Sequence, residues 1–77
     1  MEKEKRLCDI RVGECGTVCR LVAKGSMRRR LLDVGIAPGT SVLCVGKSPF
    51  GDPRAYLVRG LEIAIRNSDA RDIIIYG

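Results

Sequence analysis

Residues 15–35 decide the fold, and their sequence is CGTVCRLVAKGSMRRRLLDVG. The first part, from Cys15 to Ala23, is rich in β-forming residues whose side chains alternate between two faces. This alternation predicts the first strand of a sheet. Gly25 breaks the pattern, so the strand is expected to end before it.

A short helix is expected directly after this strand. Ser26 is a residue type that caps helices, and Met27, Leu31 and Val34 then follow at helical spacing on one stripe. Gly35 accepts the left-handed conformation that commonly ends a helix. We therefore expect a helix that begins near Ser26, ends before Gly35 and turns this apolar stripe inward.

The rest of the chain is expected to add four strands and a helical turn. Its β-branched and apolar stretches are separated by residues that favour turns. The expected strands are 40–45, 54–59, 61–66 and 73–76, with a hairpin loop at 46–53 and one helical turn at 67–71 before the last strand. Five short strands and one helix in so short a chain predict a mostly β fold that forms a closed or nearly closed small barrel.

The length of 77 residues predicts a single domain. Residues 1–6 are charged after the initiator methionine, so we expect a charged tail there and the folded domain over residues 7–77. Leu7, Ile10 and Val12 are expected to fill one end of the core. The sequence has no apolar segment long enough for a signal peptide or a membrane span, which predicts a cytoplasmic protein.

The charge balance predicts an acidic partner. The formal net charge is +5, and arginines outnumber lysines. Nucleic acid, an anionic membrane surface and an acidic protein patch all remain open on charge alone. However, Phe50, Tyr56 and Tyr76 are the only aromatic residues and are dispersed, which disfavours the base-stacking surface of a nucleic-acid-binding barrel. The lack of tryptophan disfavours the recognition of proline-rich peptides in the same way.

The residue types that catalysis needs are not grouped in the sequence. Histidine is absent, and each serine has a structural role at a cap, turn or strand. We therefore expect no enzymatic activity, no catalytic residue and no cofactor. The four cysteines lack CxxC spacing and are expected to be reduced, so we predict no metal site, although weak surface binding by one cysteine and a nearby acid stays open.

Two segments are candidates for partner binding. The arginines of the expected helix form either a solvated face or a docking surface, and Leu32 beside them lies either in an interface or over the open end of the barrel. Phe50, at the tip of the hairpin loop, either contacts a partner or packs back onto the loop. The candidate partner-binding residues are Arg28, Arg29, Arg30, Leu31, Leu32 and Phe50, of which Leu31 is the one most expected to be core.

Three motifs resemble the FeoA family. They are RRLLDVGIAPGT at residues 29–40, PFGDP at 49–53 and GLEIAIR at 60–66, and their order and spacing agree with that family from about Leu7 to Tyr76. The resemblance implies an SH3-like barrel with a helix inserted after the first strand. This agrees with the architecture expected from the residue pattern.

The resemblance also implies a function. A FeoA protein is a non-catalytic accessory of ferrous iron uptake whose partner is the membrane transporter FeoB, contacted at its cytoplasmic nucleotide-binding domain. The same fold occurs as the carboxy-terminal module of iron- and manganese-dependent transcriptional repressors, so a regulator module is an alternative. The lack of a winged-helix region ahead of the barrel favours the accessory protein. A small basic nucleic-acid-binding barrel is the second alternative.

Overall fold

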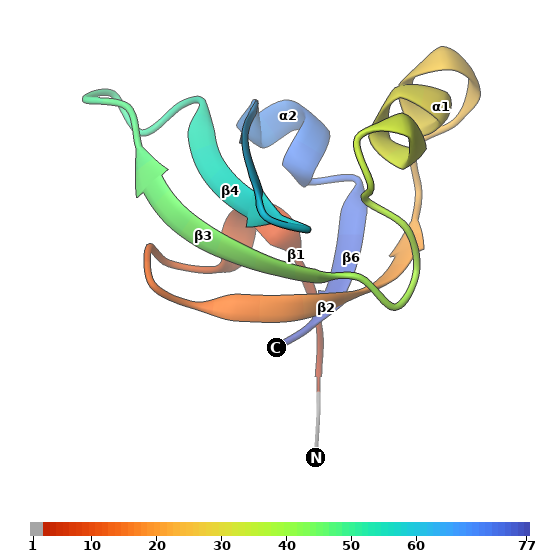
Figure 1. Ribbon diagram of the computed structural model, residues 1–77, viewed down its shortest axis with the longest axis horizontal. Helices are drawn as coiled ribbons and strands as arrows, with labels where there is room; N and C mark the ends of the chain where they lie inside the picture. The colour runs from red at the N-terminus through yellow and green to blue at the C-terminus, as the bar shows by residue number, and fades with distance from the viewer. Residues whose placement is uncertain (1–2) are drawn as a thin grey trace.

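The computed structural model describes residues 3–77, which form one curved antiparallel sheet with short helices beside it (Figure 1). The six strands run in the order β1-β6-β2-β3-β4-β5. The sheet curls on itself, so the mostly β, SH3-like fold expected from the sequence is confirmed, with a helix before β3 and a helical turn before β6. The elements are β1 (Glu4–Arg6), η1 (Leu7–Asp9), β2 (Cys15–Leu21), α1 (Gly25–Asp33), β3 (Ser41–Lys47), β4 (Arg54–Val58), β5 (Leu61–Ile65), α2 (Asn67–Ala70) and β6 (Ile73–Tyr76).

The sixth strand, β1, lies where the sequence predicted a charged tail. Its residues pair antiparallel with β6, and Glu4 is the register partner of Tyr76. The backbone N–H of Gly77 donates to the carbonyl oxygen of Lys3 at 3.5 Å. The prediction of five strands was therefore wrong. All three side chains of β1 are exposed, so its sequence does not show the alternation of apolar and polar residues by which strands were predicted. Met1 and Glu2 lie outside the described residues.

Strand β2 changes face in its middle. Its register with β6 shifts between Val18 and Arg20, which is the signature of a β-bulge. Because of the shift, Val18 and Leu21 are both buried although they are three residues apart. The alternation expected from Cys15 to Ala23 therefore holds on each side of the bulge, but the buried face changes there: Gly16 and Val18 are buried before it, and Leu21 and Ala23 after it.

The core lies inside the curl of the sheet. Leu7 and Ile10 are buried there as expected, but Val12 is 49% exposed and does not belong to the core, because it follows the turn out of η1. The largest fully buried side chains come from strands β2, β3, β4 and β6, from η1 and from the loops that follow η1 and α1: Tyr56, Leu7, Ile10, Ile36, Ile73, Ile75, Val18, Val42, Val58 and Cys44.

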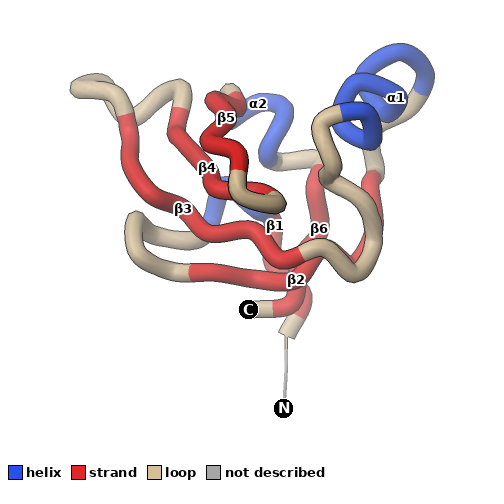
Figure 2. The backbone as a smooth tube through the Cα atoms, viewed as in Figure 1, coloured by secondary structure: helices blue, strands red, loops and turns tan. Residues whose placement is uncertain are grey.

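Helix α1 and the loop between β3 and β4 project from the sheet at opposite ends of the molecule (Figure 2). The β3–β4 hairpin contains a second register shift, between Cys44 and Gly46. Over residues 3–77, no helix has the length and apolar character needed to cross a membrane.

Candidate partner-binding surfaces

Helix α1 begins one residue earlier than Ser26 and is capped differently from the prediction. Lys24 is the N-cap residue, and no side chain caps the first turn. At the other end, the Val34 N–H donates to the Arg30 carbonyl at 3.2 Å, and the Gly35 N–H donates to the Leu32 carbonyl at 3.0 Å. Gly35 has φ of +101°, which confirms its predicted left-handed stop.

The arginines of α1 differ in whether they form a hydrogen bond to the rest of the domain. Arg28 turns back, and its Nη1 donates to the carbonyl oxygen of Leu21 at 3.4 Å. Arg29 and Arg30 are exposed, and neither forms an ion pair within residues 3–77. The helix therefore carries two exposed arginines that are not held in an ion pair within the described residues.

The two leucines of α1 have separate roles. Leu31 is only 5% exposed and packs into the core, so it anchors the helix and is not available to a partner. Leu32 is 38% exposed on the neighbouring part of the helix surface, next to the arginines. An apolar side chain that is exposed beside positive charges is a typical interface component.

A groove separates α1 from the edge strand β5, and we call it the α1–β5 groove. Val34, which was expected to face inward, is 43% exposed at this groove because the helix ends there and does not close over the sheet. The groove has a volume of about 110 Å³, and its floor includes side chains of β5 that the sequence assigned only to a strand. Its lining is Met27, Arg30, Leu31, Val34, Ile63, Ala64, Ile65 and Asp69.

Phe50 is displayed by an ordered loop. The Asp52 N–H donates to the Ser48 Oγ at 3.0 Å, and the Asn67 side-chain amide donates to the Gly51 carbonyl at 3.2 Å. Phe50 itself is 96% exposed, so it does not pack back onto the loop. A phenylalanine held in water by a fixed loop loses little conformational freedom when a partner covers it.

The structure does not bring the two candidate segments together. Figure 2 shows α1 and the β3–β4 loop on opposite sides of the curled sheet. The predicted residues therefore form two separate surfaces: the α1 surface, made of Arg28, Arg29, Arg30 and Leu32, and the Phe50 loop.

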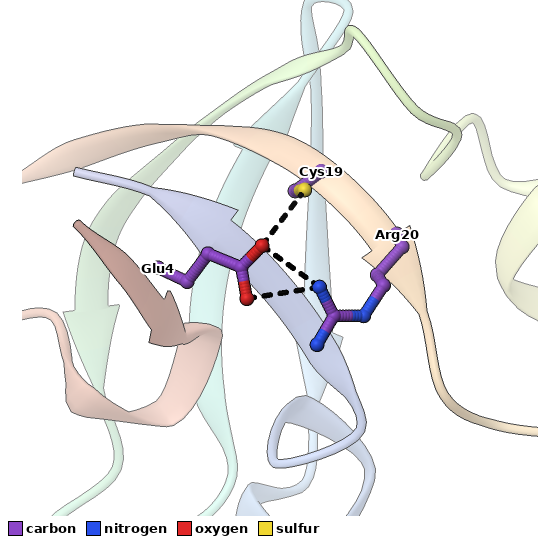
Figure 3. Close-up of polar contacts among 3 residues, drawn as sticks. All are labelled: Glu4, Cys19 and Arg20. Atoms are coloured by element: carbon purple, nitrogen blue, oxygen red, sulfur yellow. Dashed lines mark hydrogen bonds and ion pairs between the residues drawn. The ribbon is translucent and has the colours of Figure 1, made fainter. Parts of the chain in front are cut away.

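A third cluster joins β1 to β2 (Figure 3). The Nη1 atom of Arg20 lies 2.9 and 2.8 Å from the two carboxylate oxygens of Glu4, and the Cys19 thiol donates to Oε2 at 3.6 Å. Sequence reasoning missed this contact because Glu4 was placed in the tail. Both charged side chains are about half exposed, so the pair mainly orients β1 and contributes little stability.

The cysteines do not converge. All four are unpaired thiols, with Cys44 buried and Cys15 exposed. Burial and then the neighbouring carboxylate of Asp9 raise the pKa of Cys8, which keeps its thiol protonated at neutral pH. Within the described chain, no three side chains of histidine, cysteine, aspartate or glutamate group closely enough to hold a metal ion.

The fold and its surfaces define a class: a small SH3-like β domain with exposed apolar and basic groups. The family model described as FeoA domain matches residues 5–76. The chain belongs to this FeoA domain family.

Two solved structures that are similar to this chain are described as FeoA proteins. A FeoA-like protein from Clostridium acetobutylicum is 35% identical, with a TM-score of 0.88, and the match covers 97% of this chain and 87% of that one. The FeoA of Stenotrophomonas maltophilia, described as an SH3 domain protein and solved with zinc, is 25% identical, with a TM-score of 0.79, covering 97% and 88% of the two chains.

One relative is a fusion of two proteins in one polypeptide. It is the Fe(2+) transport protein A/Fe(2+) transporter FeoB fusion protein of Porphyromonas gingivalis, 28% identical over 68 residues. The match covers 88% of this chain but only 8% of the relative's length. A manganese-dependent transcriptional repressor has a similar structure, with a TM-score of 0.87 and 19% identity. The match covers 100% of this chain and 43% of the repressor chain. At this level of identity the similarity shows the fold alone.

Proposed function

We propose that this protein is a non-catalytic, cytoplasmic accessory of ferrous iron uptake that binds the cytoplasmic nucleotide-binding domain of a FeoB-type transporter. The observation that carries the proposal is the fusion relative, in which a segment similar to this chain is covalently joined to a transporter of that type. Two units that share one polypeptide are at high effective concentration, and separate chains with the same task need a binding surface instead.

The α1 surface is the proposed contact. Arg29 and Arg30 are exposed and not held in an ion pair in residues 3–77, so they can accelerate encounter with an acidic patch, and Leu32 supplies apolar area that slows dissociation. Leu31 holds the helix on the core. The contact is therefore presented by a helix that the buried Leu31 attaches to the core.

The Phe50 loop is the proposed second contact. Because it lies at the other end of the molecule from α1, both segments bind one partner only if that partner wraps around the domain or presents two separate sites. Phe50 is the most exposed large apolar side chain in the described residues, and aromatic side chains are frequent binding hot spots.

The test is an NMR titration of the labelled protein with the soluble nucleotide-binding domain of the FeoB from the same organism, with GDP and with a non-hydrolysable GTP analogue. Saturable shifts of amides in residues 25–34 are expected in at least one nucleotide state. Lack of any saturable shift in both states would contradict the proposal. A parallel titration with an RNA or DNA oligonucleotide is expected to give no saturable shifts at 150 mM salt, and saturation there would favour the nucleic-acid alternative.

A further inference from the structure

A pocket with a cationic lining lies far from α1, and we call it the cationic pocket. Its lining is Arg11, Val12, Lys47 and Arg54, and its volume is about 320 Å³. Figure 1 shows why these residues meet: the loop before β2 and the end of β3 lie on the same side of the molecule, away from α1. Three of its four lining residues are positively charged, and none is acidic.

Two of the cations are paired on neighbouring strands. Lys47 at the end of β3 and Arg54 at the start of β4 are register partners. Like charges directly opposite each other in an antiparallel pair are destabilising, because their side chains lie close together. An anion bound between the two side chains would relieve this repulsion.

The Arg54 guanidinium is held in place and only partly used. Its Nη1 donates to the carbonyl oxygen of Ile10, which ties the hairpin to the loop before β2. Its Nε is buried, and the Tyr56 hydroxyl, which is buried as well, lies beside the guanidinium. An anion in the pocket is a suitable acceptor for the remaining N–H groups of the guanidinium, because charge-assisted hydrogen bonds to an oxyanion are strong.

The backbone of Arg11 is also fixed. The Glu14 N–H donates to the Arg11 carbonyl at 2.9 Å, and the Glu14 carboxylate accepts from the Arg11 N–H at 2.7 Å. This reciprocal pair forms a tight turn, so the Arg11 side chain starts from a defined position at the rim of the pocket. The backbone positions of Arg11, Lys47 and Arg54 are thus set by this turn and by the register of β3 with β4.

The neighbouring acids form no ion pair with the cations of the pocket. The carboxylates of Asp9, Glu14 and Asp52 each accept a backbone N–H, from Arg6, Arg11 and Asn67 in turn. Within residues 3–77 the one ion pair is Arg20 with Glu4, on β2 and β1. The side chains of Arg11, Lys47 and Arg54 are therefore free of direct carboxylate partners in the described residues.

We propose that the cationic pocket binds a multiply charged oxyanion, namely a phosphate or a short polyphosphate group. Arginine and lysine together suit this chemistry, because arginine donates planar paired hydrogen bonds and lysine adds a point charge. No aromatic residue lines the pocket, so recognition is directed at the phosphate and not at a nucleobase. The assignment is independent of transporter binding, because the pocket and the α1 surface share no residue.

The test is an NMR titration of the labelled full chain with inorganic phosphate, pyrophosphate and ATP at constant ionic strength. We expect saturable shifts centred on residues 11–12, 47 and 54, with pyrophosphate binding more tightly than phosphate. Tripolyphosphate is the charge-matched reference for ATP. Equal affinity for the two would identify a free polyphosphate ligand, and tighter binding of ATP than of tripolyphosphate would identify a nucleotide as the source. Shifts that match those from sodium chloride at the same ionic strength would overturn the proposal.

Two variants separate a specific site from general attraction of anions. Lys47→Gln and Arg11→Gln each remove one lining charge at an exposed position, and each is expected to weaken pyrophosphate binding roughly tenfold without changing the rest of the spectrum. Lys24→Gln, which removes the same charge at the start of α1, is the matched control and is expected to leave the affinity unchanged. Equal weakening by all three variants, or by none, would overturn the site.

Discussion

The backbone N–H of Asn67 donates a hydrogen bond to the Oδ1 atom of Asp52 at 2.9 Å, across 15 residues of sequence. Asn67 is the first residue of α2, so this N–H has no acceptor inside the helix. The Asp52 carboxylate therefore caps α2 from a distant loop. The same contact fixes the loop that displays Phe50, which links the stability of α2 to the order of this surface.

Replacing this capping carboxylate should destabilise the protein. Asp52→Ala is expected to lower the free energy of unfolding by about 1–2 kcal/mol, because a first-turn N–H loses its charged acceptor. Urea unfolding measures the change, and Asp52→Asn, which keeps an oxygen acceptor, should lose less. Equal losses in the two variants would show that the bond to Oδ1 is not the cause.

A methyl group added at Gly16 should also destabilise the sheet. A Cβ there would lie 2.5 Å from Ile75 Cδ1 and 2.9 Å from the Tyr76 carbonyl oxygen, and the backbone atom cannot move away cheaply. We expect Gly16→Ala to cost about 2 kcal/mol of unfolding free energy. Gly46→Ala is the matched control, because no atom lies within 4 Å of its added Cβ, and it should change stability by less than about 1 kcal/mol.

Tyr56 should make stability fall at alkaline pH. Its ring is fully buried, and burial, followed by the nearby Cys44, raises the pKa of its hydroxyl to about 12, although the Arg54 guanidinium opposes the shift. The unfolded chain releases this proton near its ordinary pKa of about 10, so the folded state holds more protons between these values and loses stability as pH rises. The loss approaches about 2–3 kcal/mol by pH 12.

The Tyr56→Phe variant isolates this effect. Its unfolding free energy at pH 7 should lie within about 1 kcal/mol of the wild-type value, because the Arg54 guanidinium beside the buried hydroxyl is the one polar group that interacts with it favourably in the described residues. Its advantage should grow when urea unfolding is repeated at pH 9, 10 and 11. A difference that stays constant with pH would rule out Tyr56 as the titrating group.

Replacing the exposed Leu32 of α1 with a charged residue should weaken partner binding. Leu32→Asp is expected to reduce the affinity for the transporter's nucleotide-binding domain at least tenfold and to leave the fold intact, because Leu32 is 38% exposed. Val45→Asp makes the same change at a position of 37% exposure on β3 and serves as the control. Isothermal calorimetry compares the two, and an unchanged Leu32→Asp affinity would remove α1 from the contact.

The Phe50 loop requires its own variant because it is remote from α1. Phe50→Ser should fold normally, since a side chain that is 96% exposed contributes nothing to the core. If the loop is part of the contact, the variant should bind the same domain at least about fivefold more weakly. Wild-type affinity for Phe50→Ser together with a weakened Leu32→Asp would reduce the contact to α1 alone.

The residue pattern was sufficient to predict the elements in which local preference and packing agree. The helix before Gly35 and the last strand are examples, because helical spacing in the first and β-branched residues in the second match their environments. The bulge after Val18 could not be predicted, since it arises from pairing with β6, which lies more than fifty residues later in the chain. The pairing of Glu4 with Tyr76 could not be predicted either, because these residues lie at opposite ends of the sequence.

The candidate surfaces were predicted less completely than the fold. Exposure of Phe50 follows from its position among turn residues, but the separation of its loop from α1 depends on the curl of the whole sheet. The cationic pocket was not anticipated either. Arg11, Lys47 and Arg54 are far apart in sequence, and only the strand register and the Arg11–Glu14 turn place them around one cavity.

The hydrogen bond between Gly77 and Lys3 has a consequence for how this domain is used in longer polypeptides. It holds the two ends of the described chain together on the side of the sheet away from both α1 and the Phe50 loop (Figure 1). A protein tethered to either end therefore emerges from the same point and leaves both surfaces uncovered. The domain can be inserted into a host sequence as a module with its entry and exit side by side, and its orientation toward a partner does not depend on which end carries the tether.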